Sequence, residues 1–181
     1  MSVELVRMIK SKPLSLLYFL FIVLFLAGCA PSEPTVSQDT NKEFEVTLPP
    51  GWKMSTELND EAEFQAEHVI QEKYLIVLTE PKDEVQEYAN REEYSQATRT
   101  FVPGLKEEGP VELEIGGHPA VQYILRGKVD GYDVTYIHTI QETPDKYRQI
   151  MAWTLDSKYD SYKAELQGVI RSVKDVGVAP K

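Results

Sequence analysis

The sequence predicts an α/β fold of the α+β kind, an α/β/α sandwich around a central, largely antiparallel sheet. Three observations support this class: strand patterns joined by short turns, two amphipathic helix patterns, and one strand that is apolar on both faces. That strand spans residues 75–78, with the sequence Leu-Ile-Val-Leu. Because a strand of this kind needs cover on both sides, we expect the two helices on opposite faces of the sheet.

Strand patterns occupy much of the chain from residue 44 to residue 155. Phe44, Val46 and Leu48 alternate with polar residues and run into a Pro-Pro-Gly-Trp turn, a pattern typical of an edge strand. Further strands are expected at residues 64–69, 74–79, 111–115, 119–129, 132–142 and 147–155. The Gly-Gly turn at 116–117 and the Asp-Gly turn at 130–131 provide the positive φ angles of tight hairpins.

The two helix patterns lie after the third strand and at the end of the domain. Asn90 is expected to cap the first helix, whose apolar side extends to Leu105 and whose regular part is bent or ended by Pro103. The second helix is expected to begin at Asp156 or Ser157. We therefore expect a domain at residues 43–175, followed by a frayed tail at 176–181.

Composition limits the class of protein. The chain has 181 residues, a formal net charge of -10, 42% hydrophobic and 27% charged residues, which suits one ordinary domain with additional segments. This composition excludes a disordered acidic tail, a collagen-like repeat and a multi-pass membrane protein. The single cysteine excludes an internal disulfide, and the acidic balance argues against a nucleic-acid partner.

Residues 1–28 have the features of an export signal. Arg7, Lys10 and Lys12 precede an uncharged apolar run at 14–27. A transmembrane anchor is the alternative, but fourteen helical residues span only ~21 Å, less than the ~30 Å of the hydrocarbon core. The run ends in Leu26, Ala27, Gly28 and Cys29, which resembles a bacterial lipobox.

The lipobox resemblance implies that Cys29 carries a thioether-linked lipid with palmitate-type acyl chains and becomes the mature N-terminus. We then expect an exported, lipid-anchored protein, on the outer face of the cell membrane or attached to a membrane in the periplasm. Residues 29–42 would be the lipidated cysteine and a flexible tether, because 30–42 contain two prolines and mostly small polar residues. Fully extended, this tether would reach up to ~40 Å.

Several local sequences resemble the PsbP-like superfamily, which includes photosystem II extrinsic subunits and DcrB-type bacterial lipoproteins. They are the Phe-x-Val-x-Leu-Pro-x-Gly-Trp stretch at 44–52, the Ile-Gly-Gly-His-Pro-Ala segment at 115–120, and Trp153-Thr154 followed by a helix ending near Lys174. The resemblance covers about residues 44–174. It implies the α/β/α sandwich described above and brings no catalytic residues with it, because these motifs are structural.

A search for chemistry predicts no catalytic residue, no metal site and no cofactor. The three histidines match no catalytic or metal-ligand spacing. His138 is expected to be hydrogen-bonded on a covered sheet face, and His118 to be exposed in a turn. His68 could join Asp60, Glu61 and Glu63 around a divalent ion, but a solvated acidic edge is the favoured interpretation.

These observations favour a non-enzymatic, membrane-anchored binding or assembly module of the envelope. Its expected partners are the lipid bilayer, through Cys29, and a protein of the envelope or membrane. Tyr132 and Asp133, beside the 130–131 turn, are the predicted contact because a hairpin tip can display a functional surface. A carrier of a small ligand and an enzyme with an unrecognised site stay open as alternatives.

Replacement of Cys29 by serine tests the anchor. The Cys29→Ser protein is expected to leave the membrane or to accumulate as an unprocessed precursor, because the predicted attachment depends on one thiol. Membrane fractionation with a carbonate wash, followed by mass measurement, gives the readout. Mature-sized Cys29→Ser protein that stays in the washed membrane would contradict the prediction.

Overall fold

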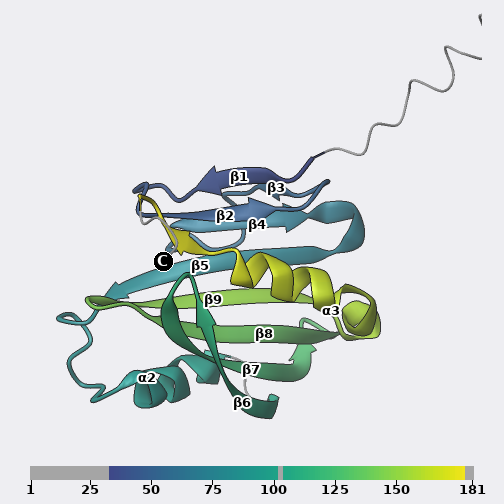
Figure 1. Cartoon of the computed structure of the whole chain (residues 1–181). Helices are drawn as coiled ribbons and strands as arrows, with labels where there is room; N and C mark the ends of the chain where they lie inside the picture. Colours follow the sequence, from purple (N-terminus) through teal and green to yellow (C-terminus); the bar gives the residue numbers. More distant parts are fainter. Residues whose placement is uncertain (1–32, 102–103, 178–181) are drawn as a thin grey trace, which may run out of the picture. The chain divides into compact units, whose positions relative to one another are not determined.

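The computed structural model describes residues 33–101 and 104–177 (Figure 1). These residues form two α-helices, α2 (Arg91–Thr98) and α3 (Asp156–Arg171), and two short 3-10 helices, η1 (Val69–Gln71) and η2 (Arg99–Phe101). Their strands are β1 (Thr35–Gln38), β2 (Phe44–Leu48), β3 (Lys53–Met54), β4 (Phe64–His68), β5 (Lys73–Pro81), β6 (Lys106–Ile115), β7 (His118–Val129), β8 (Tyr132–Glu142), β9 (Lys146–Leu155) and β10 (Lys174–Asp175).

The strands form two antiparallel sheets, whereas the sequence predicts one central, largely antiparallel sheet. The larger sheet has seven strands in the order β3-β4-β5-β9-β8-β7-β6, and the smaller has the order β1-β2-β10. Hairpins connect β6 to β7, β7 to β8, and β8 to β9, so these strands are neighbours in both sequence and space. The long connection from β5 to β6 contains α2 and η2.

The large sheet is covered on both faces, which confirms the expectation from residues 75–78. Leu75 and Val77 belong to one core cluster together with residues of β2 and α3. Ile76 belongs to a second cluster together with Tyr94 of α2, and Leu78 packs against it. Because successive side chains of a strand point to opposite faces, one apolar run serves both clusters.

The N-terminal helix pattern forms a shorter helix than expected. Asn90 caps α2 by accepting a hydrogen bond from the Glu93 amide at 3.0 Å, as predicted. Tyr94 is fully buried and stacks on Tyr147 with ring centroids 4.6 Å apart. Regular α-helix ends at Thr98, however, and residues 102–103 lie outside the described part. Within the described residues no helix is both long and apolar enough to cross a membrane.

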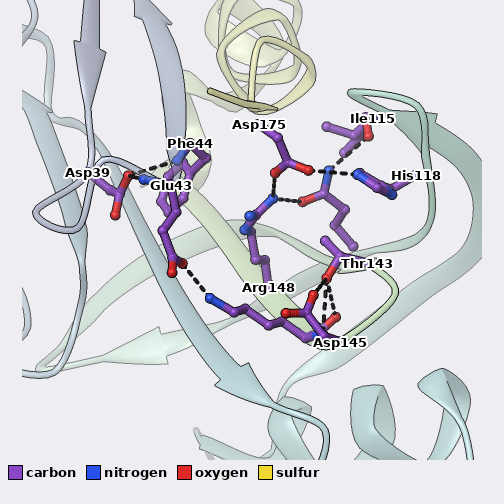
Figure 2. A network of polar contacts seen from close by, with 11 residues as sticks. Asp39, Glu43, Phe44, Ile115, His118, Thr143, Asp145, Arg148 and Asp175 are labelled. Carbon is purple, nitrogen blue, oxygen red and sulfur yellow. Dashed lines mark hydrogen bonds and ion pairs between the residues drawn. The ribbon is translucent and has the colours of Figure 1, made fainter. Parts of the chain in front are cut away.

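The flexible tether predicted for residues 29–42 is wrong from Thr35 onward. Residues 35–38 form β1, which pairs with β2 through four residue pairs from Thr35↔Leu48 to Gln38↔Glu45. Asp39 is 4% exposed, and its carboxylate accepts hydrogen bonds from the amides of Asn41, Glu43 and Phe44 at 2.8–2.9 Å (Figure 2). Main-chain pairing holds this exposed polar strand, so its side chains give no burial pattern to detect.

The C-terminal end is likewise more ordered than expected. Lys174 and Asp175 form β10 and pair with Glu45 and Phe44 of β2. The amide of Val176, placed by the sequence in the frayed tail, donates to the carbonyl of Glu43 at 2.9 Å. Residues 178–181 of the predicted tail lie outside the described part.

A buried ion pair fastens α3 to the sheet. Lys73 of β5 is 1% exposed, and its ammonium pairs with the Glu165 carboxylate of α3. The same carboxylate accepts a hydrogen bond from Trp52 Nε1 at 2.7 Å. The ammonium also lies 4.9 Å from the ring centroid of Tyr162 and 5.6 Å from that of Trp52. Burial raises the pKa of Glu165, but the hydrogen bonds from Lys73 and Trp52 outweigh this effect and lower it.

His138 lies on the face covered by α2 and has no exposed surface. Its Nε2 is 3.0 Å from Nε2 of Gln149, which satisfies the prediction of a hydrogen-bonded histidine on a covered face. Burial lowers the pKa of His138 to about 3, with a further lowering from the charge of Arg99. The imidazole is therefore neutral in the folded protein at physiological pH.

The loss of unfolding free energy should depend on which partner of the Lys73–Glu165 pair is removed. Glu165→Leu leaves a buried ammonium and should cost about 3 kcal/mol of unfolding free energy, at the low end for such pairs because Glu165 is partly exposed. Lys73→Met should cost less, since Glu165 retains its bond from Trp52 and access to water. Urea unfolding of both variants and of the double variant forms the test. Equal losses in the two single variants would contradict this account.

The buried neutral histidine should make the fold acid-sensitive. The pKa of His138 is lower in the folded state than in the unfolded state. Below pH ~6.5 the unfolded state therefore binds more protons, and the unfolding free energy decreases as the pH is lowered. Between pH 7 and pH 5 this effect should remove roughly 2 kcal/mol. Urea titrations at both pH values should show the loss in the parent and a smaller loss in His138→Gln. An unchanged loss in His138→Gln would assign the acid sensitivity to other groups.

Candidate functional site

The predicted lipidation residues precede the described part of the chain. Leu26, Ala27, Gly28 and Cys29 all lie outside the described residues. The described residues include the predicted contact residues Tyr132 and Asp133, the three histidines and the acidic cluster near residue 60.

The most concentrated polar network lies at the end of the large sheet where β6 meets β7 and β8 meets β9 (Figure 2). Asp175 of β10 is at its centre. Its carboxylate is 2.6 Å from Nη1 of Arg148 and 2.9 Å from Nε2 of His118. Arg148 is 4% exposed, donates to Gln141 Oε1 at 3.1 Å, and places its guanidinium 4.9 Å from the ring centroid of Phe44.

This network joins the two sheets. Burial raises the pKa of Asp175, but the hydrogen bonds from His118 and Arg148 outweigh it, so the pKa is lowered and the carboxylate stays ionised. His118 is thus half-buried and paired, and the expectation that it is exposed is wrong, because β10 brings a carboxylate to the β6–β7 turn. One oxygen of Asp175 faces Arg148 and the other faces His118, an arrangement suited to fixing β10 against β7 and β9.

The hypothetical metal site around His68 does not form. In the described residues, no group of three or more His, Cys, Asp and Glu side chains is arranged to hold a metal ion. Glu63 instead accepts a hydrogen bond from the Thr79 amide at 2.9 Å. His68 packs against the glycine turn at Gly51, where a Cβ would lie 2.5 Å from its Nε2. This contact explains the need for glycine in the Pro-Pro-Gly-Trp turn, which also has a φ of +87° there.

Tyr132 and Asp133 lie at the β7–β8 hairpin tip, as predicted, but on opposite faces of it. Asp130 and Gly131 have φ angles of 51° and 88°, which form the tight turn. Tyr132 is 66% exposed and shares its face with Tyr136, four residues on. Asp133 points to the other face and pairs with Lys128 at 3.1 Å. The two residues therefore share a corner of the molecule without forming one continuous surface.

A row of aromatic side chains extends from Tyr132 across the sheet. Trp153 of β9 is opposite Tyr136 of β8 on one side and opposite Tyr74 of β5 on the other. Its ring centroid is 5.8 Å from that of Tyr136 and 5.3 Å from that of Tyr74, with the second pair stacked at 20°. Tyr74 and Trp153 are only partly buried. Tyr132 and these three rings constitute the aromatic end of the sheet.

The sequence could not assemble this row. Its members come from three strands, and only the pairing register brings Tyr74, Tyr136 and Trp153 level with one another. The signal that was available is the abundance of tyrosine, ten in the chain, together with the alternation of Tyr132, Val134 and Tyr136 in one strand.

Two grooves flank α3 on the other face of the sheet. One, of about 260 Å³, is lined mainly by apolar groups between β1–β2 and α3 and includes Pro34, Pro49 and Val169. The other, of about 320 Å³, lies between α3 and the β6–β7 hairpin, with Val111, Leu113 and Ile124 among its apolar lining. Lys163 and Arg171 of α3 line the second groove and form no ion pair within the described residues.

Comparison with known proteins gives matches in structure alone. No family model matches the sequence, and no curated protein matches it. Among solved structures, LpqN, described as involved in cell envelope biogenesis of Mycobacterium tuberculosis, has a TM-score of 0.57 and 14% identity over 78% of this chain and 90% of its own. A Bacteroides thetaiotaomicron protein has a TM-score of 0.55 and 14% identity; the match spans 84% of this chain and 51% of that one.

Cyanobacterial PsbP (CyanoP) from Synechocystis has a TM-score of 0.51 and 13% identity over 82% of this chain and 95% of its own. Similarity at this level of identity shows the fold and leaves the activity open. The expected fold class is confirmed: the described chain is a mixed α+β structure with antiparallel sheets, and its fold is PsbP-like.

Proposed function

We propose that this protein is an envelope lipoprotein, anchored to a membrane through Cys29, whose PsbP-like domain is a non-catalytic binding or assembly module. The lipobox at residues 26–29 supports the anchor. The fold shared with LpqN, a protein described as involved in cell envelope biogenesis, is compatible with an envelope location. The structural roles of two histidines are compatible with a binding module: His138 is fully buried against Gln149, and His118 pairs with Asp175 of β10.

The observation that carries the proposal is the aromatic end of the sheet. Tyr132 is 66% exposed at the hairpin tip, and the partly exposed Tyr74 and Trp153 lie farther along the same face of the sheet. Aromatic side chains of this kind bury much area at low conformational entropy, which is why they are enriched at protein contacts. Asp133 flanks the same corner with a largely exposed carboxylate, whose ion pair with Lys128 is weak in water.

The net charge of the domain and its attachment to a membrane indicate what kind of partner it suits. Loss of residues 1–28 removes three basic and one acidic residue and changes the formal net charge from -10 to -12. A basic or neutral protein surface would complement this charge, and association would be faster at low salt. Attachment to one membrane face raises the effective concentration of the domain for a neighbouring membrane protein, so modest contact affinity suffices.

Substitutions at the corner test the contact. Tyr132→Ala should reduce capture of the partner from the native membrane at least about fivefold, as expected for an exposed aromatic anchor. Asp133→Lys should weaken capture less and reduce its salt dependence. Affinity capture from solubilised native membranes with quantitative mass spectrometry measures both effects.

Val111→Ala is the matched control, since Val111 is 58% exposed on β6, away from this corner. All three variants should keep their unfolding free energy within ~0.5 kcal/mol of the parent, because they replace exposed side chains. Normal capture by folded Tyr132→Ala and Asp133→Lys proteins would refute this site assignment.

A carrier of a small ligand is the second candidate function. It is favoured by the groove of about 320 Å³, which is lined by Lys163 and Arg171, by Glu108 and Glu112, and by apolar side chains of β6 and β7. The same capture series distinguishes the two candidates. If the Lys163→Glu protein loses a bound small molecule while the Tyr132→Ala protein captures the partner as the parent does, the carrier is favoured over the protein-binding module.

A further inference from the structure

The segment between Cys29 and the folded domain is much shorter than the sequence predicts. β1 begins at Thr35 and is held by β2 along its whole length, so only residues 30–34 separate Cys29 from the first strand. Six residue steps span at most ~20 Å, whereas the expected tether would reach up to ~40 Å. A lipid on Cys29 would therefore keep the start of β1 close to the lipid surface.

The start of β1 lies at the same end of the domain as the β4–β5 turn. Thr35 is opposite Leu48, where β2 ends, and the chain then turns through Gly51 into β3. Gly51 contacts His68, the last residue of β4. Figure 1 shows the beginning of β1 and the β4–β5 turn on the right-hand side of the domain.

The β4–β5 turn displays two aliphatic side chains to solvent. Val69 is 62% exposed and Ile70 is 90% exposed, the highest value among the exposed large hydrophobic residues of the described chain. Both belong to the 3-10 turn η1, in which no residue is buried. Two glutamates flank the turn: Glu72 pairs with Lys158 of α3, and Glu67 lies in β4, two residues before Val69.

We propose that Val69 and Ile70 form a second membrane contact, in which the β4–β5 turn inserts into the interface of the leaflet that holds the Cys29 lipid. This inference rests on the proposed lipid anchor. Two aliphatic side chains are too few to hold a protein on a membrane by themselves. A lipid anchor within ~20 Å of the start of β1, at the same end of the domain, gives them a high effective lipid concentration. With a mature charge of -12, the contact suits zwitterionic lipid better than anionic lipid.

The contact would also orient the corner at Tyr132. Lys73, at the start of β5, is opposite Thr154, and Leu155, at the end of β9, is opposite Val134 near the start of β8. The β4–β5 turn and the β7–β8 tip therefore lie at the same end of the large sheet. Seating η1 on lipid would bring Tyr132 to the level of the headgroups, where tyrosine is favoured, and would direct the corner toward a membrane protein.

Fluorescence quenching by brominated lipid tests the contact in the complete lipoprotein. Ile70→Trp places a reporter at the turn and keeps the apolar character of the side chain. Val111→Trp is the matched control, because Val111 is also exposed and apolar but pairs with Gln122, seven residues along β7 from Val129 at the tested end. Each purified lipoprotein is reconstituted on phosphatidylcholine vesicles, with and without bromine on the acyl chains near the interface.

The added fluorescence of Ile70→Trp should be quenched at least about twofold more than that of Val111→Trp, since an inserted side chain lies ~5–10 Å deep in the interface. Val69→Trp provides a second reporter at the same turn and should behave like Ile70→Trp. Equal quenching of the turn reporters and the Val111→Trp control would overturn the inference.

Flotation of the same samples separates this outcome from failure of the anchor. If the parent and all variants float with the vesicles but the turn reporters are quenched no more than the control, the second contact is wrong and the anchor stands. If the parent lipoprotein does not float, the anchor itself is wrong and the inference falls with it.

Discussion

The large sheet has to be covered on both faces, and the rest of the structure follows from this constraint. Its central strands β5 and β9 contribute apolar side chains to both core clusters, so neither face can be left to water. Helix α3 and strand β2 supply one cover, and α2 with the adjoining loops supplies the other. With both faces largely covered, the two most exposed large hydrophobic side chains of the described residues, Ile70 and Tyr132, lie at one end of the sheet.

The two ends of the large sheet differ in chemistry. At the end with the β6–β7 and β8–β9 turns, polar contacts of Asp175 with Arg148 and His118 join the sheets (Figure 2). At the opposite end, the β4–β5 and β7–β8 turns expose Ile70 and Tyr132. The first end stabilises the assembly of the two sheets. At the second end, apolar side chains stay exposed to solvent in the folded domain. The chain also enters the domain from this end, through β1.

Charged side chains fasten elements that hydrophobic packing alone would leave poorly fixed. Lys73 and Glu165 join α3 to β5, and Arg148 and Asp175 join the two-residue strand β10 to β9. Buried ion pairs of this kind add modest net stability, because desolvation offsets much of the attraction between the charges. Their geometry nevertheless specifies one docking position, since any other would leave a buried charge without its partner.

The sequence by itself determined the strands with strong alternation, the glycine turns, the Asn90 cap and the two-sided cover of residues 75–78, because each is a local pattern tied to burial. It failed for β1, β3 and β10, which are short, largely exposed and held by main-chain pairing that any polar sequence can make. The tertiary structure alone decided the length of the N-terminal link, the pairing of His118 with Asp175 and the aromatic row. Each depends on residues distant in sequence and brought together by strand register, which no local pattern encodes.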